Sequence, residues 1–178
     1  DSASVYFRAN DVKPDSFVIY RWDRKTAKRE VVFDQEGLWS VSAHRPDGRL
    51  LLTKELGSSV SEIYEWDPTQ RALAPIIGQG EREEYTAAYG AAPGEILILT
   101  PKLGEFRRLY LWKGKSAPLS PITPEIKHDV SAFTIDDTRA RVLYTINEDG
   151  FTRLKALDGR SFRPIALPKL PEADHLVP

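Results

Sequence analysis

The stretch Asn147–Gly159, with the sequence NEDGFTRLKALDG, carries two turn signals around one short strand pattern. Asn147-Glu148-Asp149-Gly150 and Asp158-Gly159 consist largely of residues that favour the backbone angles of tight turns. The intervening Thr152–Leu157 is therefore predicted to be a strand. Three other places in the chain end a strand in nearly the same way, so this stretch is one copy of a repeat.

The four copies of this strand follow one another at a spacing of about 45 residues. They begin at Ile19, Ile63, Leu109 and Leu154. A period of this length is found in propellers and in helical solenoids. Long segments with the 3.6-residue periodicity of helices are not visible, so the repeat favours a propeller. The copies read Ile19-Tyr20-Arg21-Trp22-Asp23, Ile63-Tyr64-Glu65-Trp66-Asp67, Leu109-Tyr110-Leu111-Trp112-Lys113-Gly114 and Leu154-Lys155-Ala156-Leu157-Asp158-Gly159.

Each repeat consists of short strand patterns separated by turns such as Pro46-Asp47-Gly48 and Pro93-Gly94. Four strands in about 45 residues make one blade of a β-propeller, whose first strand lines the central channel. The predicted fold class is all-β, a β-propeller with about four blades of four antiparallel strands. The predicted strands are Ser4–Arg8, Ser16–Trp22, Arg29–Phe33; Trp39–Ala43, Arg49–Lys54, Glu62–Trp66, Leu73–Ile77; Tyr85–Tyr89, Glu95–Thr100, Arg108–Trp112, Pro118–Ile122; Val130–Ile135, Arg141–Ile146, Thr152–Leu157 and Arg163–Leu167.

The predicted blades cover residues 1–37, 38–82, 83–126 and 127–170 of a single propeller segment, 1–178. The first repeat lacks its innermost strand, and residues 171–178 occupy the place where the innermost strand of a further blade should begin. Either this tail supplies the missing strand and closes a four-bladed ring, or the chain is an arc of a larger ring. We favour the arc, because most propellers have more than four blades.

The segment His128–Gly159 resembles one blade of the N-terminal propeller of bacterial prolyl oligopeptidase-family serine peptidases. Such a blade has a strand, a Ser-Pro-Asp-Gly-like turn, a strand of the type LAFVTNEDG, and then SRLYLLD. Val142–Gly150 and Thr152-Arg153-Leu154 follow this pattern, and Ile135-Asp136-Asp137-Thr138 replaces the turn. The second repeat fits it as well, through Arg45-Pro46-Asp47-Gly48-Arg49 and the strand that ends at Asp67.

The resemblance implies a seven-bladed propeller over the mouth of an α/β-hydrolase domain with a Ser-Asp-His triad. In that family the propeller admits peptides and excludes folded proteins, and bacterial relatives are often exported. We therefore expect a non-catalytic, extracytoplasmic arc of the ring, whose partners are the hydrolase domain of the same parent polypeptide and peptide substrates. The hydrolase domain itself is absent from this chain. A nucleophile elbow needs Gly-x-Ser-x-Gly, and both Gly37–Ser42 and Gly114–Pro118 lack the second Gly.

Composition excludes several other classes of partner and site. The chain is 41% hydrophobic and 29% charged, as in a soluble globular protein. A net charge of -1 gives no basic field for nucleic acid or an anionic membrane, and apolar runs such as Ile96–Leu99 are far too short to span a bilayer. No Cys is present, so disulfides and thiolate metal sites are excluded. Because the chain begins at Asp1 and contains no Met, we expect a processed form or a fragment.

No catalytic, cofactor-binding or metal-binding residue is predicted. His44 and His128 lie near innermost strands and could face the channel, but together with His175 they lack the short spacings of metal motifs. The acidic run Glu81-Arg82-Glu83-Glu84 could bind a peptide N-terminus or a cation, although a solvated loop is the preferred interpretation. The 26 acidic residues show no singled-out catalytic pair.

Three further patterns have structural explanations. Arg107 and Arg108 point to opposite faces of a strand, and each is expected to pair with a neighbouring acid. Gly78-Gln79-Gly80 lacks the third Gly and the strand–helix unit of a dinucleotide fingerprint. The Trp-Asp pairs at 22–23 and 66–67 are similar to those of WD repeats: Trp is expected to fill the gap between blades and Asp to cap a turn.

Two other functions remain open at this stage. A stand-alone protein-interaction propeller of the WD or TolB kind explains the blades without an enzyme. An enzyme with its active site in the channel would need several charged residues on the innermost strands. Those strands are small and mostly uncharged, and they read Val41-Ser42-Ala43, Thr86-Ala87-Ala88 and Val130-Ser131-Ala132-Phe133. An open arc would also expose apolar blade faces, so we expect self-association.

Overall fold

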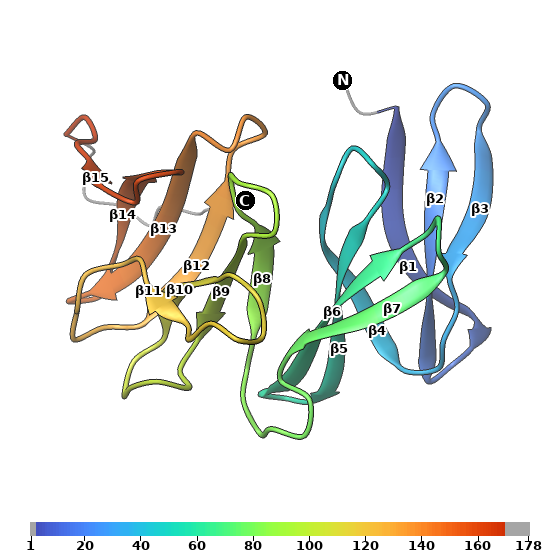
Figure 1. The fold of residues 1–178 in the computed structure, drawn as a ribbon, viewed down its shortest axis with the longest axis horizontal. Helices are drawn as coiled ribbons and strands as arrows, with labels where there is room; N and C mark the ends of the chain where they lie inside the picture. The colour runs from blue at the N-terminus through green and yellow to red at the C-terminus, as the bar shows by residue number, and fades with distance from the viewer. Residues whose placement is uncertain (1–2, 170–178) are drawn as a thin grey trace. The chain divides into compact units, whose positions relative to one another are not determined.

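The computed structural model describes residues 3–169 and contains only β-strands and their connections there. The chain divides into two compact units, and the boundary between them in the sequence lies between Tyr85 and Thr86. Each unit contains two antiparallel sheets (Figure 1). Across the described residues, no helix is long and apolar enough to cross a membrane. The predicted all-β class of four antiparallel sheets is confirmed.

The first unit contains one sheet of three strands and one of four. The first sheet has the order β1-β2-β3, and the second sheet has the order β4-β5-β6-β7. The prediction that the first repeat has only three strands is confirmed. The strands are β1 (Ser4–Lys13), β2 (Ser16–Asp23), β3 (Lys28–Phe33), β4 (Leu38–His44), β5 (Leu50–Gly57), β6 (Val60–Asp67) and β7 (Ala72–Ile77).

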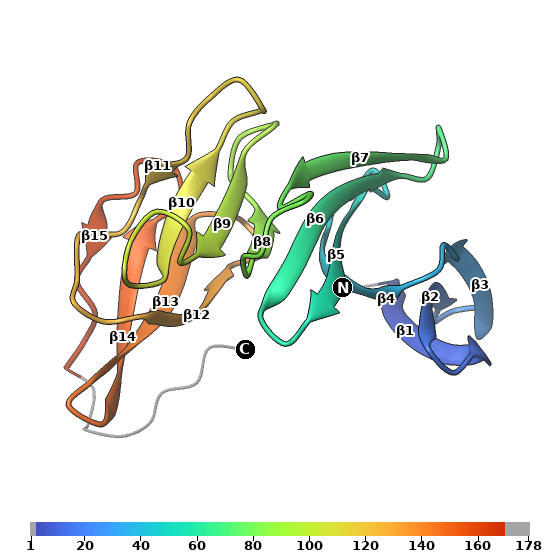
Figure 2. The ribbon, with the colours of Figure 1, turned by 90° about the horizontal axis from the view of Figure 1, so that it is seen from below.

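The second unit contains two sheets of four strands, with the orders β8-β9-β10-β11 and β12-β13-β14-β15 (Figure 2). These third and fourth sheets end in strands of two residues, where the sequence predicts Pro118–Ile122 and Arg163–Leu167. Proline lacks the N–H that a ladder needs, and Pro121 and Pro164 lie in these strands. The strands are β8 (Thr86–Tyr89), β9 (Ile96–Thr100), β10 (Arg108–Trp112), β11 (Ser120–Pro121), β12 (Val130–Ile135), β13 (Arg141–Glu148), β14 (Phe151–Asp158) and β15 (Pro164–Ile165).

The same pairs of positions face each other in all four sheets. The repeated motif lies on β2, β6, β10 and β14. In each copy, the residue before the final Asp or Lys pairs with an aliphatic residue on the preceding strand. The pairs are Val5 with Trp22, Leu50 with Trp66, Ile96 with Trp112, and Val142 with Leu157. Two residues further along each ladder, Phe7 pairs with Tyr20, Leu52 with Tyr64, Ile98 with Tyr110, and Tyr144 with Lys155. The sequence repeat is therefore a repeat of register.

An aromatic cluster joins the two sheets of the first unit. Phe33 meets Trp39 and Trp66 edge to face, at ring-centroid distances of 4.9 and 5.2 Å, and Trp39 meets Tyr64 at 5.3 Å. Ile19, Leu50 and Leu52 are buried around these rings. Trp66 thus fills the gap between sheets as predicted. Trp22 does not: it remains 37% exposed, because the described residues include no sheet on its side of β2.

An aliphatic cluster joins the two sheets of the second unit. Leu97, Leu99 and Leu109 of the third sheet lie with Val142 and Leu157 of the fourth sheet in one buried core. All five residues of β9 are buried, and Leu97 and Leu99 of this strand belong to this core. The two units therefore use the same sheet positions with different side chains.

In three sheets, an aspartate ends the strand that carries the repeated motif (β2, β6 or β14) and organises the turn after it. One carboxylate oxygen accepts the backbone N–H groups of the second and third residues after it, at 2.7–3.1 Å. The residue after the turn then has a positive φ. The aspartates are Asp23, Asp67 and Asp158, and the positive-φ residues are Ala27, Arg71 and Phe162. In the third sheet, Gly114 has a φ of 107° and follows Lys113, which replaces the aspartate.

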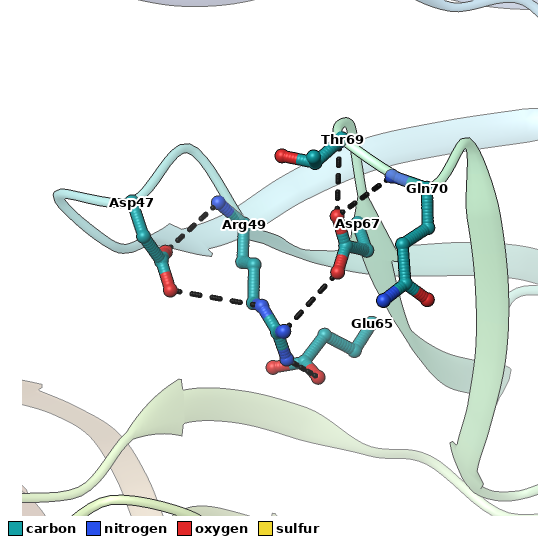
Figure 3. Close-up of polar contacts among 6 residues, drawn as sticks. All are labelled: Asp47, Arg49, Glu65, Asp67, Thr69 and Gln70. Carbon is teal, nitrogen blue, oxygen red and sulfur yellow. Dashed lines mark hydrogen bonds and ion pairs between the residues drawn. The ribbon is translucent and has the colours of Figure 1, made fainter.

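Arg49 links the turn at Asp67 to the hairpin between β4 and β5 (Figure 3). Its guanidinium lies 3.1 Å from a carboxylate oxygen of Asp67, 3.4 Å from one of Glu65 and 3.6 Å from one of Asp47. Asp47 also accepts the backbone N–H of Arg49. Exposed ion pairs contribute little individually, but this network fixes two neighbouring turns to each other.

The opening stretch forms a tight hairpin between β13 and β14. Glu148 pairs with Phe151, so the loop has two residues, Asp149 and Gly150, with φ values of 53° and 85°. Two successive positive φ values define a type I′ turn, which matches the twist of the strands. The turn predicted at Asn147–Gly150 is confirmed.

We expect Asp158→Asn to destabilise the protein in a pH-dependent way. Hydrogen bonds from the backbone and hydroxyl of Ser161 and from the backbone of Arg160 hold the pKa of Asp158 below its ordinary value of 3.8. A lowered carboxyl pKa stabilises the fold above the unfolded-state pKa, and this contribution is lost as pH falls through the folded-state pKa. The variant should melt a few degrees below the parent at neutral pH, and the gap should close as pH falls below 3.8 and through the lowered pKa of Asp158. Thermal unfolding followed by circular dichroism measures it. Asp137→Asn, in an exposed turn, is the control, and an equal effect of both variants would contradict the assignment.

Candidate functional site

The acidic run lies in the loop between β7 and β8, at the end of the first unit. The loop begins at Gly78, whose backbone φ of +98° is a conformation that favours glycine. A Cβ at this position would lie 2.7 Å from the carbonyl oxygen of Ser61. The N–H of Glu81 donates to the carbonyl of Gly78 and closes a turn at 3.0 Å. The loop therefore runs directly against β6.

Ser61 clamps this loop to the start of β6. Its hydroxyl donates to the carbonyl of Tyr85 at 3.1 Å and accepts the N–H of Tyr85 at 2.8 Å. Its own N–H donates to the carbonyl of Glu83 at 3.0 Å. Ser61 is buried, so these bonds are shielded from water. The start of the third strand thus holds the segment that leads to the next sheet.

The same clamp occurs at Ser16, at the start of β2. Its hydroxyl accepts the N–H of Gly37 at 3.0 Å and contacts the carbonyl of Gly37 at 3.4 Å. A related contact occurs in the second unit, but there the side chain belongs to the segment before the next sheet: the Asp129 carboxylate accepts the N–H of Arg107 at 2.7 Å. Sequence reasoning missed all three clamps. The only signal was a serine near the start of both β2 and β6, and these two serines are one position apart when the repeats are aligned.

Glu62 is a buried carboxylate beneath the acidic loop. It accepts the phenol hydroxyl of Tyr64 at 2.7 Å, and its other oxygen is 3.4 Å from the N–H of Gly80. Burial, followed by the hydrogen bond and the charge of Glu62, raises the pKa of Tyr64 to about 12. The side-chain amide of Gln79 bridges the carbonyls of Ile63 and Ile77 at 3.0 Å each.

Two carboxylates at this loop, those of Glu81 and of Glu62 beneath it, accept hydrogen bonds from tyrosines. Glu81 accepts the phenol hydroxyl of Tyr85, Glu62 accepts that of Tyr64, and Glu83 contributes its carbonyl to Ser61. Between residues 3 and 169, no three His, Asp or Glu side chains are grouped so as to hold a metal ion. The predicted solvated loop is thus anchored on β6 by bonds that its own sequence does not reveal.

A cavity of about 480 Å³ lies in the second unit, between the β9–β10 loop and the β11–β12 connection. Leu103, Phe106 and Ile126 provide apolar lining, and Arg108 lies among them. Charges of both signs complete the lining, from Glu105, Glu125 and Lys127. The lining is therefore mixed, with three apolar and four charged side chains.

Arg108 lines this cavity, and its side chain is bonded to the main chain. One of its terminal nitrogens donates to the carbonyl of Thr123 at 2.6 Å, whereas its Nε and the buried hydroxyl of Thr123 have no hydrogen-bond partner. The expected pairing with an acid is therefore replaced by a bond to the main chain. The neighbouring Arg107 contributes backbone groups, whose carbonyl accepts the N–H of Val130 at 3.0 Å.

The remaining sequence candidates occupy structural positions. His44 ends β4, with its ring 5.7 Å from that of Tyr6, and His128 is half-buried before β12. His175 lies outside the described residues. Ser40 lies within β4 rather than at a strand-to-helix turn, so the Gly37–Ser42 stretch does not have the shape of a nucleophile elbow.

No protein-family model matches the sequence, and neither does any curated protein sequence. Solved structures do match. TolB from Acinetobacter baumannii is similar over 96% of this chain and 42% of its own, with a TM-score of 0.70 and 16% identity. A structure from a study of two prolyl endopeptidases is similar over 96% of this chain and 27% of its own, with a TM-score of 0.74 and 17% identity.

A third similar structure is the β-propeller domain of the Trilobed protease from Pyrococcus furiosus. It covers 88% of this chain and 49% of its own length, with a TM-score of 0.59 and 20% identity. The chain thus spans less than half of each of these three structures. At such identities the likeness concerns the fold, and the β-propeller predicted from the repeat is confirmed.

The clamp at Ser61 predicts that Gly78→Ala is more damaging than substitution at other left-handed glycines. A left-handed backbone costs alanine about 1–2 kcal/mol, and at Gly78 the added Cβ also meets the Ser61 carbonyl. We expect Gly78→Ala to lower the free energy of unfolding by about 2–4 kcal/mol. Gly80→Ala, at φ +76° with open space around it, is the control and should cost about 1 kcal/mol. Urea unfolding followed by tryptophan fluorescence measures both, and equal losses would contradict the clamp.

The Glu62–Tyr64 pair predicts an alkaline instability. Because the pKa of Tyr64 rises from 10.0 to about 12, its contribution to stability is complete below pH 10 and is lost as pH rises toward 12. Glu62→Gln should lower the pKa of Tyr64 but leave it above 10, since burial is the larger cause. Carbon NMR of ring-labelled tyrosine follows the titration. Glu65→Gln is the control, and a pKa unchanged by Glu62→Gln would contradict the pairing.

Proposed function

We propose that this chain is a non-catalytic segment of the β-propeller of a prolyl oligopeptidase-like serine peptidase. In this proposal, blades at about 1–37, 38–82, 83–126 and 127–170 form part of a ring over a hydrolase domain of the same polypeptide. The observation that carries it is the likeness of 96% of the chain to the prolyl endopeptidase structure, together with the family-like stretch His128–Gly159.

The proposed role is to restrict which molecules reach the hydrolase domain. Hydrogen-bonded sheets are stiff, and the clamps at Ser16, Ser61 and Asp129 tie each third strand to the segment leading into the next sheet. These bonds fix the course of the segment that follows each of the first three sheets. Fixed connections of this kind suit a wall that filters access to a hydrolase domain, and they support the proposed role of a filter rather than a catalyst.

We further propose that peptides contact the cavity around Arg108 on their way past the propeller. Leu103 and Phe106 suit an apolar peptide side chain, and the charges of Glu105 and Lys127 suit the polar main chain or a peptide terminus. Both signs of charge are present, so broad rather than sequence-specific contact with peptides is expected.

The second candidate is a protein-interaction propeller of the TolB kind. The likeness to TolB from Acinetobacter baumannii, over 96% of this chain, favours it independently of any enzyme. The peptidase proposal requires a hydrolase domain with a reactive serine in the same polypeptide, and the interaction propeller requires none. The two proposals also differ in ligand, which is a peptide in the first and a folded protein in the second.

The test is the mass and serine reactivity of the native polypeptide that contains this sequence. We expect a mass several times the 20.1 kDa of this chain, and covalent labelling of the same polypeptide by a fluorophosphonate probe. Heat-denatured polypeptide is the control for nonspecific labelling. A native polypeptide of about 20.1 kDa, or a longer one that resists the probe, would reject the peptidase proposal and favour the interaction propeller.

A further inference from the structure

Arg108 is a cation without an acid partner among the residues that the structure describes. Its Nη2 donates to the carbonyl of Thr123 at 2.6 Å, whereas its Nε is buried and has no hydrogen-bond partner. By contrast, the Nε of Arg21 lies 2.7 Å from a carboxylate oxygen of Glu30. Arg108 therefore keeps a positive charge and a buried donor that residues 3–169 leave unpaired.

The free end of this guanidinium belongs to the wall of the cavity of about 480 Å³. The second terminal nitrogen, Nη1, has no hydrogen-bond partner within the described range and, unlike Nε, is not buried. The bond to Thr123 holds the guanidinium in place, so a ligand that binds it immobilises less side-chain freedom than at a flexible arginine. A guanidinium held in this way, with donors left over, suits a carboxylate, which can accept two N–H groups at once.

The acidic residues of the cavity do not create the opposite demand. Glu105 and Glu125 line the cavity, are exposed, and form no ion pair in the described part of the chain. Exposed carboxylates stay hydrated, whereas a buried donor without an acceptor is costly. Lys127 adds a second positive charge to the same lining. The cavity therefore lacks an acceptor rather than a donor, which favours an anionic group over an amine as its ligand.

Apolar side chains lie beside this charged group. Leu103 and Phe106 come from the β9–β10 loop, and Ile126 comes from the β11–β12 connection. Leu103 is 55% exposed, so its side chain is open to a ligand. A ligand that fills this cavity thus combines a carboxylate with an adjacent apolar group.

We propose that this cavity binds the C-terminal residue of a peptide whose last side chain is apolar. The terminal carboxylate accepts hydrogen bonds from Arg108, and the last side chain lies against Leu103 and Phe106. The inference rests on the proposed contact of peptides with this cavity, and it adds which end of the peptide is held. Only the last residue is specified, so peptides that differ elsewhere in sequence fit equally well.

NMR titration of the 178-residue chain with N-acetyl-Gly-Gly-Leu tests the proposal. We expect saturable shifts of the backbone amides of Gly104 and Lys127. The N-acetyl-Gly-Gly-Leu amide, which lacks the terminal charge, should bind about tenfold more weakly or worse. N-acetyl-Gly-Gly-Gly should also bind more weakly, because it lacks the apolar side chain.

The same titration has outcomes that would overturn the proposal. Equal binding of the acid and its amide would exclude recognition of the carboxylate. Tighter binding of Gly-Gly-Leu amide, whose amine is its only charge, would assign the cavity to the other end of the peptide. Binding of none of these peptides would exclude the site altogether.

Two matched pairs of variants locate the site. Arg108→Gln should weaken the binding of N-acetyl-Gly-Gly-Leu by about tenfold, whereas Arg160→Gln, an exposed arginine outside the cavity, should not. Leu103→Ser should weaken it by about threefold or more, whereas Leu56→Ser should not, although Leu56 is similarly exposed at 51%. Leu103 is on the surface, so its variant remains informative if Arg108→Gln unfolds. Equal effects within either pair would contradict the assignment.

The failure of this proposal can be told apart from the failure of the peptidase proposal. If the native polypeptide reacts with the fluorophosphonate probe and this chain binds no peptide, the cavity is rejected alone. If this chain binds the peptide and the native polypeptide has no reactive serine, the peptidase is rejected and the cavity remains the site of a peptide-binding propeller.

Discussion

The pairing of the second and third strands sets the register on which the rest of each sheet depends. Side chains alternate between the two faces of a strand, so a slip of one residue would move every apolar side chain to the wrong face. The pair of Leu50 with Trp66 and the pair of Val142 with Leu157 place large side chains on the face that the preceding sheet covers. Both pairs belong to buried cores, one aromatic and one aliphatic. The register therefore fixes which positions carry large buried side chains, whereas the residue types at those positions differ between the two cores.

Polar groups at the two ends of the third strand protect this register. At the end of the strand, an aspartate such as Asp67 accepts the N–H groups of the adjoining turn. At its start, a serine such as Ser61 holds the segment that leads into the next sheet. The first kind of joint is local, and the second joins residues 24 positions apart. A strand fixed at both ends cannot shift along its neighbour without the loss of several hydrogen bonds.

The same use of polar groups within the fold gives the acidic loop partners that its own sequence does not reveal. Four charged residues in a row indicate solvent exposure when they are considered alone. In the fold, Glu81 meets the hydroxyl of Tyr85, and Glu62, which lies outside the run, meets Tyr64. Tyr64 belongs to the repeated motif that packs the sheets, and Tyr85 lies at the start of a predicted strand. The carboxylate of Glu81, which suggested a ligand site, is thus engaged by the protein itself. The cavity at Arg108, in contrast, has an unpartnered Nε among apolar and charged residues.

The sequence by itself determined the all-β class, the repeat, the three-stranded first sheet and the turns at Asp67, Asp158 and Asn147–Gly150. These features arise from short-range chemistry: turn residues fix backbone angles, and alternation fixes faces. Only the tertiary structure decided the clamps at Ser16 and Ser61, the partners of Glu62 and Arg108, and the exposure of Trp22. Trp22 and Trp66 lie in nearly identical motifs, and their exposure differs because, among the described residues, a sheet covers Trp66 and none covers Trp22. Contacts between residues far apart in the chain depend on which surfaces the fold brings together, and no local pattern encodes them.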